Sequence, residues 1–92
     1  MSDPTSKDID IIPLARKKLA RRKIPEPWVI ETLRVPTQVV EGYGGRRVAQ
    51  KRIAKEGKEY LLRVVYEETG TAYVVITAYL TSDFMRYWRE TP

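Results

Sequence analysis

The feature that most constrains the fold of this chain is a pair of β-rich runs in its second half. The runs EYLLRVVYEE, residues 59–68, and TAYVVITAYL, residues 71–80, are rich in valine, isoleucine, tyrosine and threonine, and Thr69-Gly70 separates them. These residue types favour strands, and a short connection containing glycine favours a hairpin. Because both runs are apolar on both sides, we predict that the hairpin lies at the centre of a sheet.

Two shorter β-type segments precede the hairpin, TQVVEGY at 37–43 and RRVAQKRIA at 46–54, and a turn containing glycine follows each of them. Prolines divide the region before them into two short helices, because Pro13 suits a helix start and Ile24-Pro25 a helix end. Ser82 is the expected N-cap of a short C-terminal helix. The predicted fold class is therefore α+β, with two N-terminal helices, a four-stranded antiparallel sheet and a short C-terminal helix.

The length of 92 residues predicts one domain with a single modest core. We expect residues 1–13 to form a flexible or extended N-terminal segment and residues 14–92 to form the domain. No stretch has the character of a signal peptide or the length of a membrane span, so we predict a cytoplasmic protein without membrane contact. The chain contains no cysteine and no histidine, which excludes disulfides and Cys/His zinc sites. We predict no metal and no cofactor.

The positive charge is concentrated in two segments. The formal net charge is +5, and six of the ten residues 14–23 are Lys or Arg while none is acidic. Residues 36–55 hold five basic residues and one acidic residue. Localised basic charge favours a polyanionic partner, most often nucleic acid, although charge also serves solubility alone.

The charges of the first predicted helix are not equivalent. At about 100° per residue, Leu14, Ala15 and Leu19 form the arc expected to face the core, and Lys18 and Arg22 fall inside that arc. Leu14, Lys18 and Arg22 thus form a stripe at i, i+4 and i+8. The stripe either lines a cleft that binds anions, or packs its stems while its charged ends reach water.

Three segments carry a resemblance to a known family: LARKKLARRKIPEPWVIETLRVP, LLRVVYEETG and YVVITAYLTSDFMRYW. They resemble a bacterial domain-of-unknown-function family, DUF four-two-five-eight, which is related to the RelE/ParE-like and BrnT-like toxin ribonucleases. The resemblance covers nearly everything after Pro13. The family motif has histidine where this chain has Leu14, arginine where it has Lys18 and glycine where it has Lys23, while Arg22 and Ile24 are kept. A mechanism that uses the family histidine is therefore excluded here.

The resemblance implies a RelE-like or barnase-like ribonuclease toxin architecture and metal-independent cleavage of RNA. RelE-like ribonucleases use lysine, arginine and tyrosine, whose contribution is largely electrostatic and positional. The matching candidates for catalysis are Lys51, Arg63, Thr77 and Tyr87, and those for RNA or anion binding are Lys18, Arg22, Arg52 and Arg86.

Each catalytic candidate has a structural alternative. Lys51 and Arg52 are neighbours on one strand, so at most one of them faces the site, and the family pattern favours Lys51. Arg63 shares a face with Thr77 and Tyr79 if the hairpin loop has three residues, but not if it has two. The structural alternative for Tyr87, which the sequence favours, is a packing residue that closes a small core.

Three classes of function stay open. The leading hypothesis is the toxin half of a toxin–antitoxin pair, an endoribonuclease with RNA as substrate and an acidic antitoxin-like protein as partner. The alternative is a catalytically inactive relative that binds nucleic acid or protein on the same scaffold. A third is a structural module whose exposed strand pairs with a partner.

Overall fold

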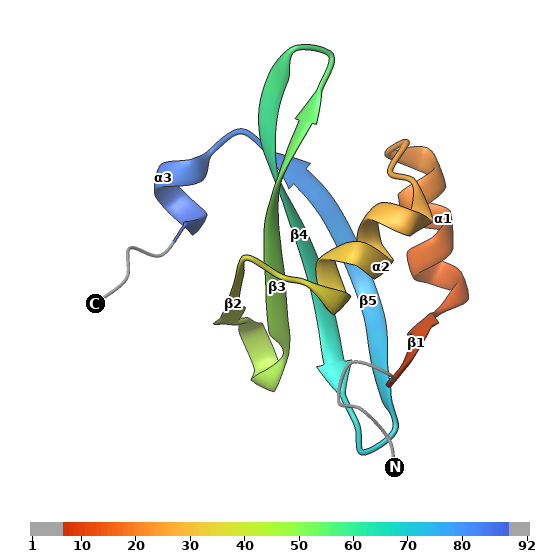
Figure 1. Ribbon diagram of the computed structural model, residues 1–92. Coiled ribbons are helices and arrows are strands. Elements are labelled where there is room, and N and C mark those ends of the chain that lie inside the picture. Colours follow the sequence, from red (N-terminus) through yellow and green to blue (C-terminus); the bar gives the residue numbers. More distant parts are fainter. Residues whose placement is uncertain (1–6, 89–92) are drawn as a thin grey trace.

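The computed structural model describes residues 7–88, and these form one five-stranded mixed sheet flanked by helices (Figure 1). The strand order is β1-β5-β4-β3-β2. Strand β1 runs parallel to β5, and the other neighbouring pairs are antiparallel. The strands are β1 (Asp8–Ile11), β2 (Gln38–Glu41), β3 (Arg47–Lys55), β4 (Lys58–Glu68) and β5 (Ala72–Thr81).

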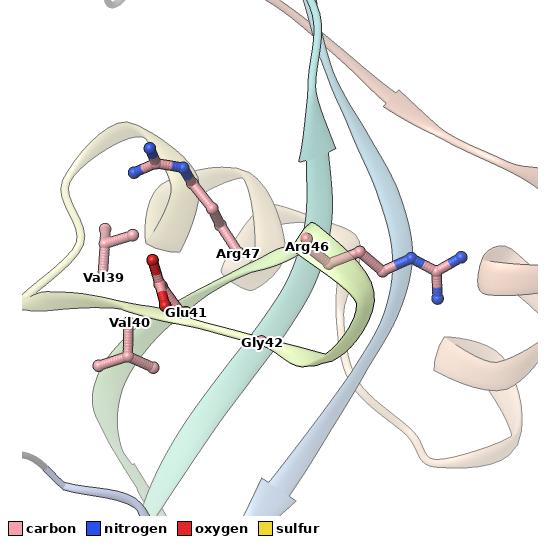
Figure 2. Close-up of a pocket in the computed structure, with 7 residues that line it drawn as sticks. Val39, Val40, Glu41, Gly42, Arg46 and Arg47 are labelled. Carbon is pink, nitrogen blue, oxygen red and sulfur yellow. The ribbon is translucent and has the colours of Figure 1, made fainter.

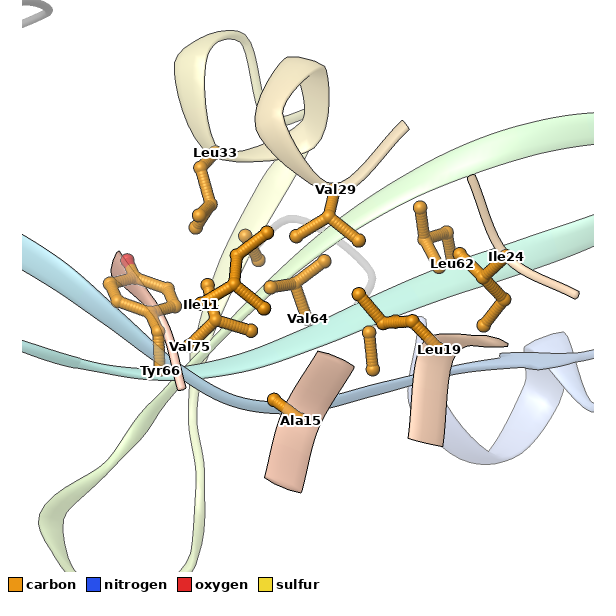
Figure 3. Packing of buried hydrophobic residues seen from close by; sticks show 12 residues of the cluster. Ile11, Ala15, Leu19, Ile24, Val29, Leu33, Leu62, Val64, Tyr66 and Val75 are labelled. Atoms are coloured by element: carbon orange, nitrogen blue, oxygen red, sulfur yellow. The ribbon is translucent and has the colours of Figure 1, made fainter. Parts of the chain in front are cut away.

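The helices lie on both sides of this sheet. Figure 1 shows α1 (Pro13–Arg21) and α2 (Glu26–Arg34) on one side, and the short α3 (Phe84–Tyr87) on the other. The main core lies beneath α1 and α2, where Leu19 and Val29 pack over Leu62, Val64 and Val75 (Figure 3). None of the helices within residues 7–88 has the length and apolar character needed to cross a membrane.

The predicted layout of four antiparallel strands was wrong, because the sheet has a fifth strand near the N-terminus. Asp8–Ile11 pairs in parallel with Ala72–Val75, which makes the sheet mixed. Consequently α1 and α2 lie between β1 and β2 instead of opening the domain. Four residues alternating Asp and Ile carry a weak strand signal, and a parallel partner about sixty residues away leaves no local pattern to read.

Helix α1 begins at Pro13, as the proline predicts, and ends in a left-handed turn. Lys23 has a φ of 57°, and its N–H donates to the carbonyl of Ala20 at 3.1 Å. The N–H of Ile24 donates to the carbonyl of Leu19 at 2.9 Å. These two bonds make a Schellman motif with Lys23 at the position that glycine usually occupies.

The predicted inward arc of α1 is only partly observed. Ala15 and Leu19 are buried, but Leu14 is 57% exposed and Lys18 is half-buried. At the other end of the chain, Asp83 caps α3 by accepting a hydrogen bond from the N–H of Arg86, in place of the predicted Ser82. Aspartate is favoured at N-caps as serine is, and the cap lies one residue later than predicted.

Candidate functional site

A row of polar side chains crosses the sheet on the face opposite α1 and α2, which we call the Arg63 face. The strand register sets Gln38 of β2 opposite Gln50 of β3, Gln50 opposite Arg63 of β4, and Arg63 opposite Tyr79 of β5. Residues directly opposite one another point to the same face, so the row is continuous. Four neighbouring strands thus bring distant residues together.

A β-bulge sets Arg63 opposite Tyr79. Next to the hairpin loop, Glu68 pairs with Tyr73, and this register would set Arg63 opposite Ala78, which faces the core. The register shifts by one between Val65 and Tyr66, and the extra residue on β5 returns Tyr79 to the Arg63 face. Pairing of Glu68 with Tyr73 leaves an even number of residues in the turn, so the loop alone does not give the predicted shared face, and the bulge produces it instead.

The guanidinium of Arg63 is held from three directions. Its Nε donates to Oε1 of Gln50 at 2.6 Å, and its Nη1 donates to the hydroxyl of Tyr79. Its central carbon lies 4.0 Å from the ring centroid of Tyr87, a cation–π contact. Within residues 7–88, the remaining nitrogen, Nη2, makes no hydrogen bond. The arginine is therefore fixed in place with donor capacity left for an anion.

Gln50 and Tyr87 complete what we call the Arg63 cluster, formed by Gln50, Arg63, Tyr79 and Tyr87. Gln50 is fully buried, and its Nε2 donates to Oε1 of Gln38 at 2.8 Å and to the carbonyl of Tyr87 at 3.2 Å. The Tyr87 ring also meets the Tyr79 ring edge to face, with centroids 6.3 Å apart. Gln50 thereby connects the sheet to α3, and α3 places Tyr87 against Arg63.

A pocket of about 520 Å³ opens beside Arg63. Its polar lining comes from Arg46, Arg63, Tyr79 and Glu41, and its apolar lining includes Val48 and Val65. The side chain of Arg46 forms no ion pair or hydrogen bond within the described part of the chain. A second hollow of about 280 Å³ lies at the same turn, and Arg46 and Arg47 leave that turn on opposite sides (Figure 2).

The structure separates the two basic candidates on β3. Arg52 lies on the Arg63 face, where its guanidinium contacts the rings of Phe84 and Trp88 at 5.3 and 5.2 Å and pairs with Glu59 at 3.6 Å. Lys51 lies on the helix-covered face and pairs with Glu31 of α2 at 3.3 Å. Sequence reasoning favoured Lys51 for the site, but strand alternation turns it away from Arg63 and directs Arg52 there.

Arg22 and Thr77 meet at the edge of the sheet. β1 pairs with β5 only as far as Val75, so the outer edge of β5 is uncovered beyond that residue. Nη1 of Arg22 donates there to the Ala78 carbonyl at 2.8 Å and to Oγ1 of Thr77 at 3.0 Å. Arg22 therefore donates hydrogen bonds to acceptors at an exposed strand edge, and the Thr77 hydroxyl is one of these acceptors.

The last two candidates lie apart from each other. Arg86 is exposed on α3, with its guanidinium 5.2 Å from the Tyr87 ring, next to the cluster. Lys18 lies on α1, on the other side of the sheet from Arg63. The structure thus brings Arg63, Tyr87, Arg52 and Arg86 to one face and leaves Lys51 and Lys18 outside it.

The sequence did not single out two residues of the site, Gln50 and Arg46. Gln50 could have been found from its spacing. It lies two residues before Arg52 in the same strand, so the two side chains point to the same face. Arg46 was noticed only as part of a basic segment. The described residues contain no group of three or more His, Cys, Asp or Glu side chains that could hold a metal ion.

Burial changes the pKa of one tyrosine that lies outside the site. Burial raises the pKa of the Tyr66 phenol above its ordinary value of 10.0, and the charge of Glu68 adds to the effect. Tyr66 lies in the core beneath the helices and contacts Tyr73 edge to face at 5.4 Å.

Comparison with known proteins does not place this chain. A scan against models of protein families, a search of curated proteins and a search of solved structures each found no match. The resemblance drawn from the sequence motifs stays a prediction.

Proposed function

We propose that this protein is a small endoribonuclease of the toxin class, which cleaves RNA without a metal ion at the Arg63 cluster. The observation that carries the proposal is the fixed guanidinium of Arg63, which Gln50, Tyr79 and Tyr87 hold and whose Nη2 makes no hydrogen bond to residues 7–88. A preorganised cation beside a pocket is suited to stabilise the charge that develops on a reacting phosphate.

The chemistry uses the RNA's own 2′-oxygen. This oxygen attacks the adjacent phosphorus and loses its proton to water, while the bond to the 5′-oxygen breaks, leaving a 2′,3′-cyclic phosphate and a 5′-hydroxyl. Arg63 stabilises the charged pentacoordinate state. The Tyr79 hydroxyl accepts its hydrogen bond from Arg63, so its own proton is free to move to the leaving 5′-oxygen, and water then returns a proton to Tyr79.

The turn that ends α1 supports the family resemblance on which the toxin class rests. Lys23, where the family has glycine, occupies a left-handed position that glycine favours. Leu14, where the family has histidine, lies on a helix across the sheet from Arg63. The loss of that histidine therefore leaves the groups of the Arg63 cluster intact.

The alternative is an RNA-binding relative that does not cleave, and the absence of a histidine favours it. It predicts binding whose logarithmic affinity falls with logarithmic salt concentration, without strand scission.

As partner we propose an acidic antitoxin-like protein that covers the Arg63 face, where Arg46, Arg52 and Arg86 are exposed. Co-purification of the chain with the product of a neighbouring gene tests this partner.

The deciding experiment is incubation of purified protein with labelled RNA in the presence of EDTA. We expect wild-type protein to yield fragments with cyclic phosphate ends, and Arg63→Ala to reduce the rate by about 100-fold or more. Lys58→Ala, at the exposed far end of β4, removes a positive charge away from the cluster and serves as the matched control. Absence of cleavage, or equal cleavage by wild type and Arg63→Ala with unchanged circular dichroism, would refute the proposal.

A further inference from the structure

The turn that joins β2 to β3 presents an aromatic ring and a cation beside the Arg63 pocket. Tyr43 is 97% exposed, the most exposed of the large hydrophobic side chains in the described chain. It begins the 3₁₀ turn Tyr43–Gly45, in which Gly44 and Gly45 have φ values of 69° and 80°. These positive φ values favour glycine, so the backbone of the tight turn fixes the point from which the Tyr43 side chain projects into solvent.

Arg46, at the end of the same turn, lines the pocket beside Arg63. Both arginines line the 520 Å³ pocket, together with Tyr43 and Tyr79. Arg46 makes no side-chain bond within residues 7–88, and Nη2 of Arg63 is also unused. Two guanidinium groups with free donors at one pocket are suited to hold a phosphate.

Glu41 is the acidic group of this pocket, and its position leaves the phosphate site open. It lies opposite Arg47 in the strand register, and Figure 2 shows its carboxylate on the side of Arg47 and not of Arg46. Among residues 7–88, neither Arg46 nor Arg63 forms an ion pair with an acidic side chain.

We propose that Tyr43, Arg46 and Arg63 form a subsite for one unpaired nucleotide of single-stranded RNA, with its base stacked on Tyr43 and its phosphate between the two arginines. A flat, exposed ring binds any base through its π-face, and a duplex cannot present one. The inference deepens the proposed function and rests on it, because it names single-stranded RNA as the substrate class of the Arg63 pocket.

The test measures binding of a short, labelled 2′-O-methyl oligoadenylate, which lacks the attacking hydroxyl and cannot be cleaved. We expect Tyr43→Ala to weaken binding by about 5- to 150-fold, as for loss of one stacked base, and Tyr43→Phe to bind like wild type. A duplex of the same length should bind equally to all three proteins.

The neighbouring arginines provide a matched pair of variants. Arg46→Ala should reduce the slope of logarithmic affinity against logarithmic salt by about 0.7, the value for one phosphate contact on a single strand. Arg47→Ala removes the same charge one residue away, on the other side of the turn, and should leave that slope unchanged.

The outcomes separate the subsite from the proposed function. Unchanged binding by Tyr43→Ala, or equal effects of Arg46→Ala and Arg47→Ala, overturns the subsite even if Arg63-dependent cleavage is found, and would leave Tyr43 to a protein partner. Binding that depends on Tyr43 and Arg46, in a protein that cleaves no RNA, upholds the subsite and refutes the nuclease.

Discussion

Replacing Gln50 with methionine tests whether a buried amide holds Arg63 in its place. Gln50 is fully buried and makes three side-chain hydrogen bonds, to Arg63, Gln38 and the carbonyl of Tyr87. Methionine is unbranched and of similar volume but cannot form these bonds. The variant therefore removes the polar contacts while it preserves most of the packing.

The expected loss of stability follows from the three bonds. The bond to the charged guanidinium is worth about 1.5 kcal/mol, the low end for a charged partner because Arg63 is half-exposed, and each neutral bond about 1 kcal/mol. Water can replace part of the hydrogen bonding that the partners of Gln50 lose, so the expected loss in free energy of unfolding is about 3 kcal/mol. For a domain of this size, that lowers Tm by about 12–24 °C.

Urea unfolding followed by circular dichroism gives the free energy of unfolding for four proteins: wild type, Gln50→Met, Arg63→Met and the double variant. Because Gln50 and Arg63 bond directly, the double variant should lose about 1.5 kcal/mol less than the sum of the single losses. A loss below about 1 kcal/mol for Gln50→Met, or additivity within about 0.5 kcal/mol, would refute the reasoning.

Three further predictions address the helix end, the second basic candidate and the core tyrosine. Lys23→Gly should raise the free energy of unfolding by about 0.5–1 kcal/mol, because it relieves a left-handed residue, whereas Lys17→Gly within α1 should lower it by about 1 kcal/mol; urea titration measures both. Lys51→Ala should change RNA cleavage less than threefold, roughly 0.6 kcal/mol of activation free energy, since Lys51 pairs with Glu31 away from the site; equal loss with Arg63→Ala contradicts this. The folded pKa of Tyr66 is raised, so its contribution to stability is complete below pH 10 and is lost as the pH rises through the folded pKa; urea midpoints across this range should fall more steeply for wild type than for Tyr66→Phe.

Much of the secondary structure could be read from local patterns. The hairpin of β4 and β5, the two helices bounded by prolines and the strands on either side of the Gly44-Gly45 turn all lie where the sequence predicts them. Each of these signals depends on neighbouring residues: side-chain type, proline geometry and glycine in a turn. The absence of cysteine and histidine limits the chemistry equally directly.

The assembly of the site depends on contacts between residues far apart in the chain. Strand alternation predicts that Lys51 and Arg52 diverge, but only the pairing with β4 shows that Arg52 shares the face of Arg63. The bulge on β5 places Tyr79 on that face. Without the one-residue shift in register, Tyr79 would point to the opposite face of the sheet.

The composition and local spacing of this chain therefore determine a basic α+β protein that works without thiol or imidazole chemistry. The tertiary structure alone decides that β1 pairs with the first part of β5 and that Gln50, Tyr79 and Tyr87 surround Arg63. The physical reason is that turns, caps and alternation are set by adjacent residues, whereas register and parallel pairing are set by burial across the whole sheet.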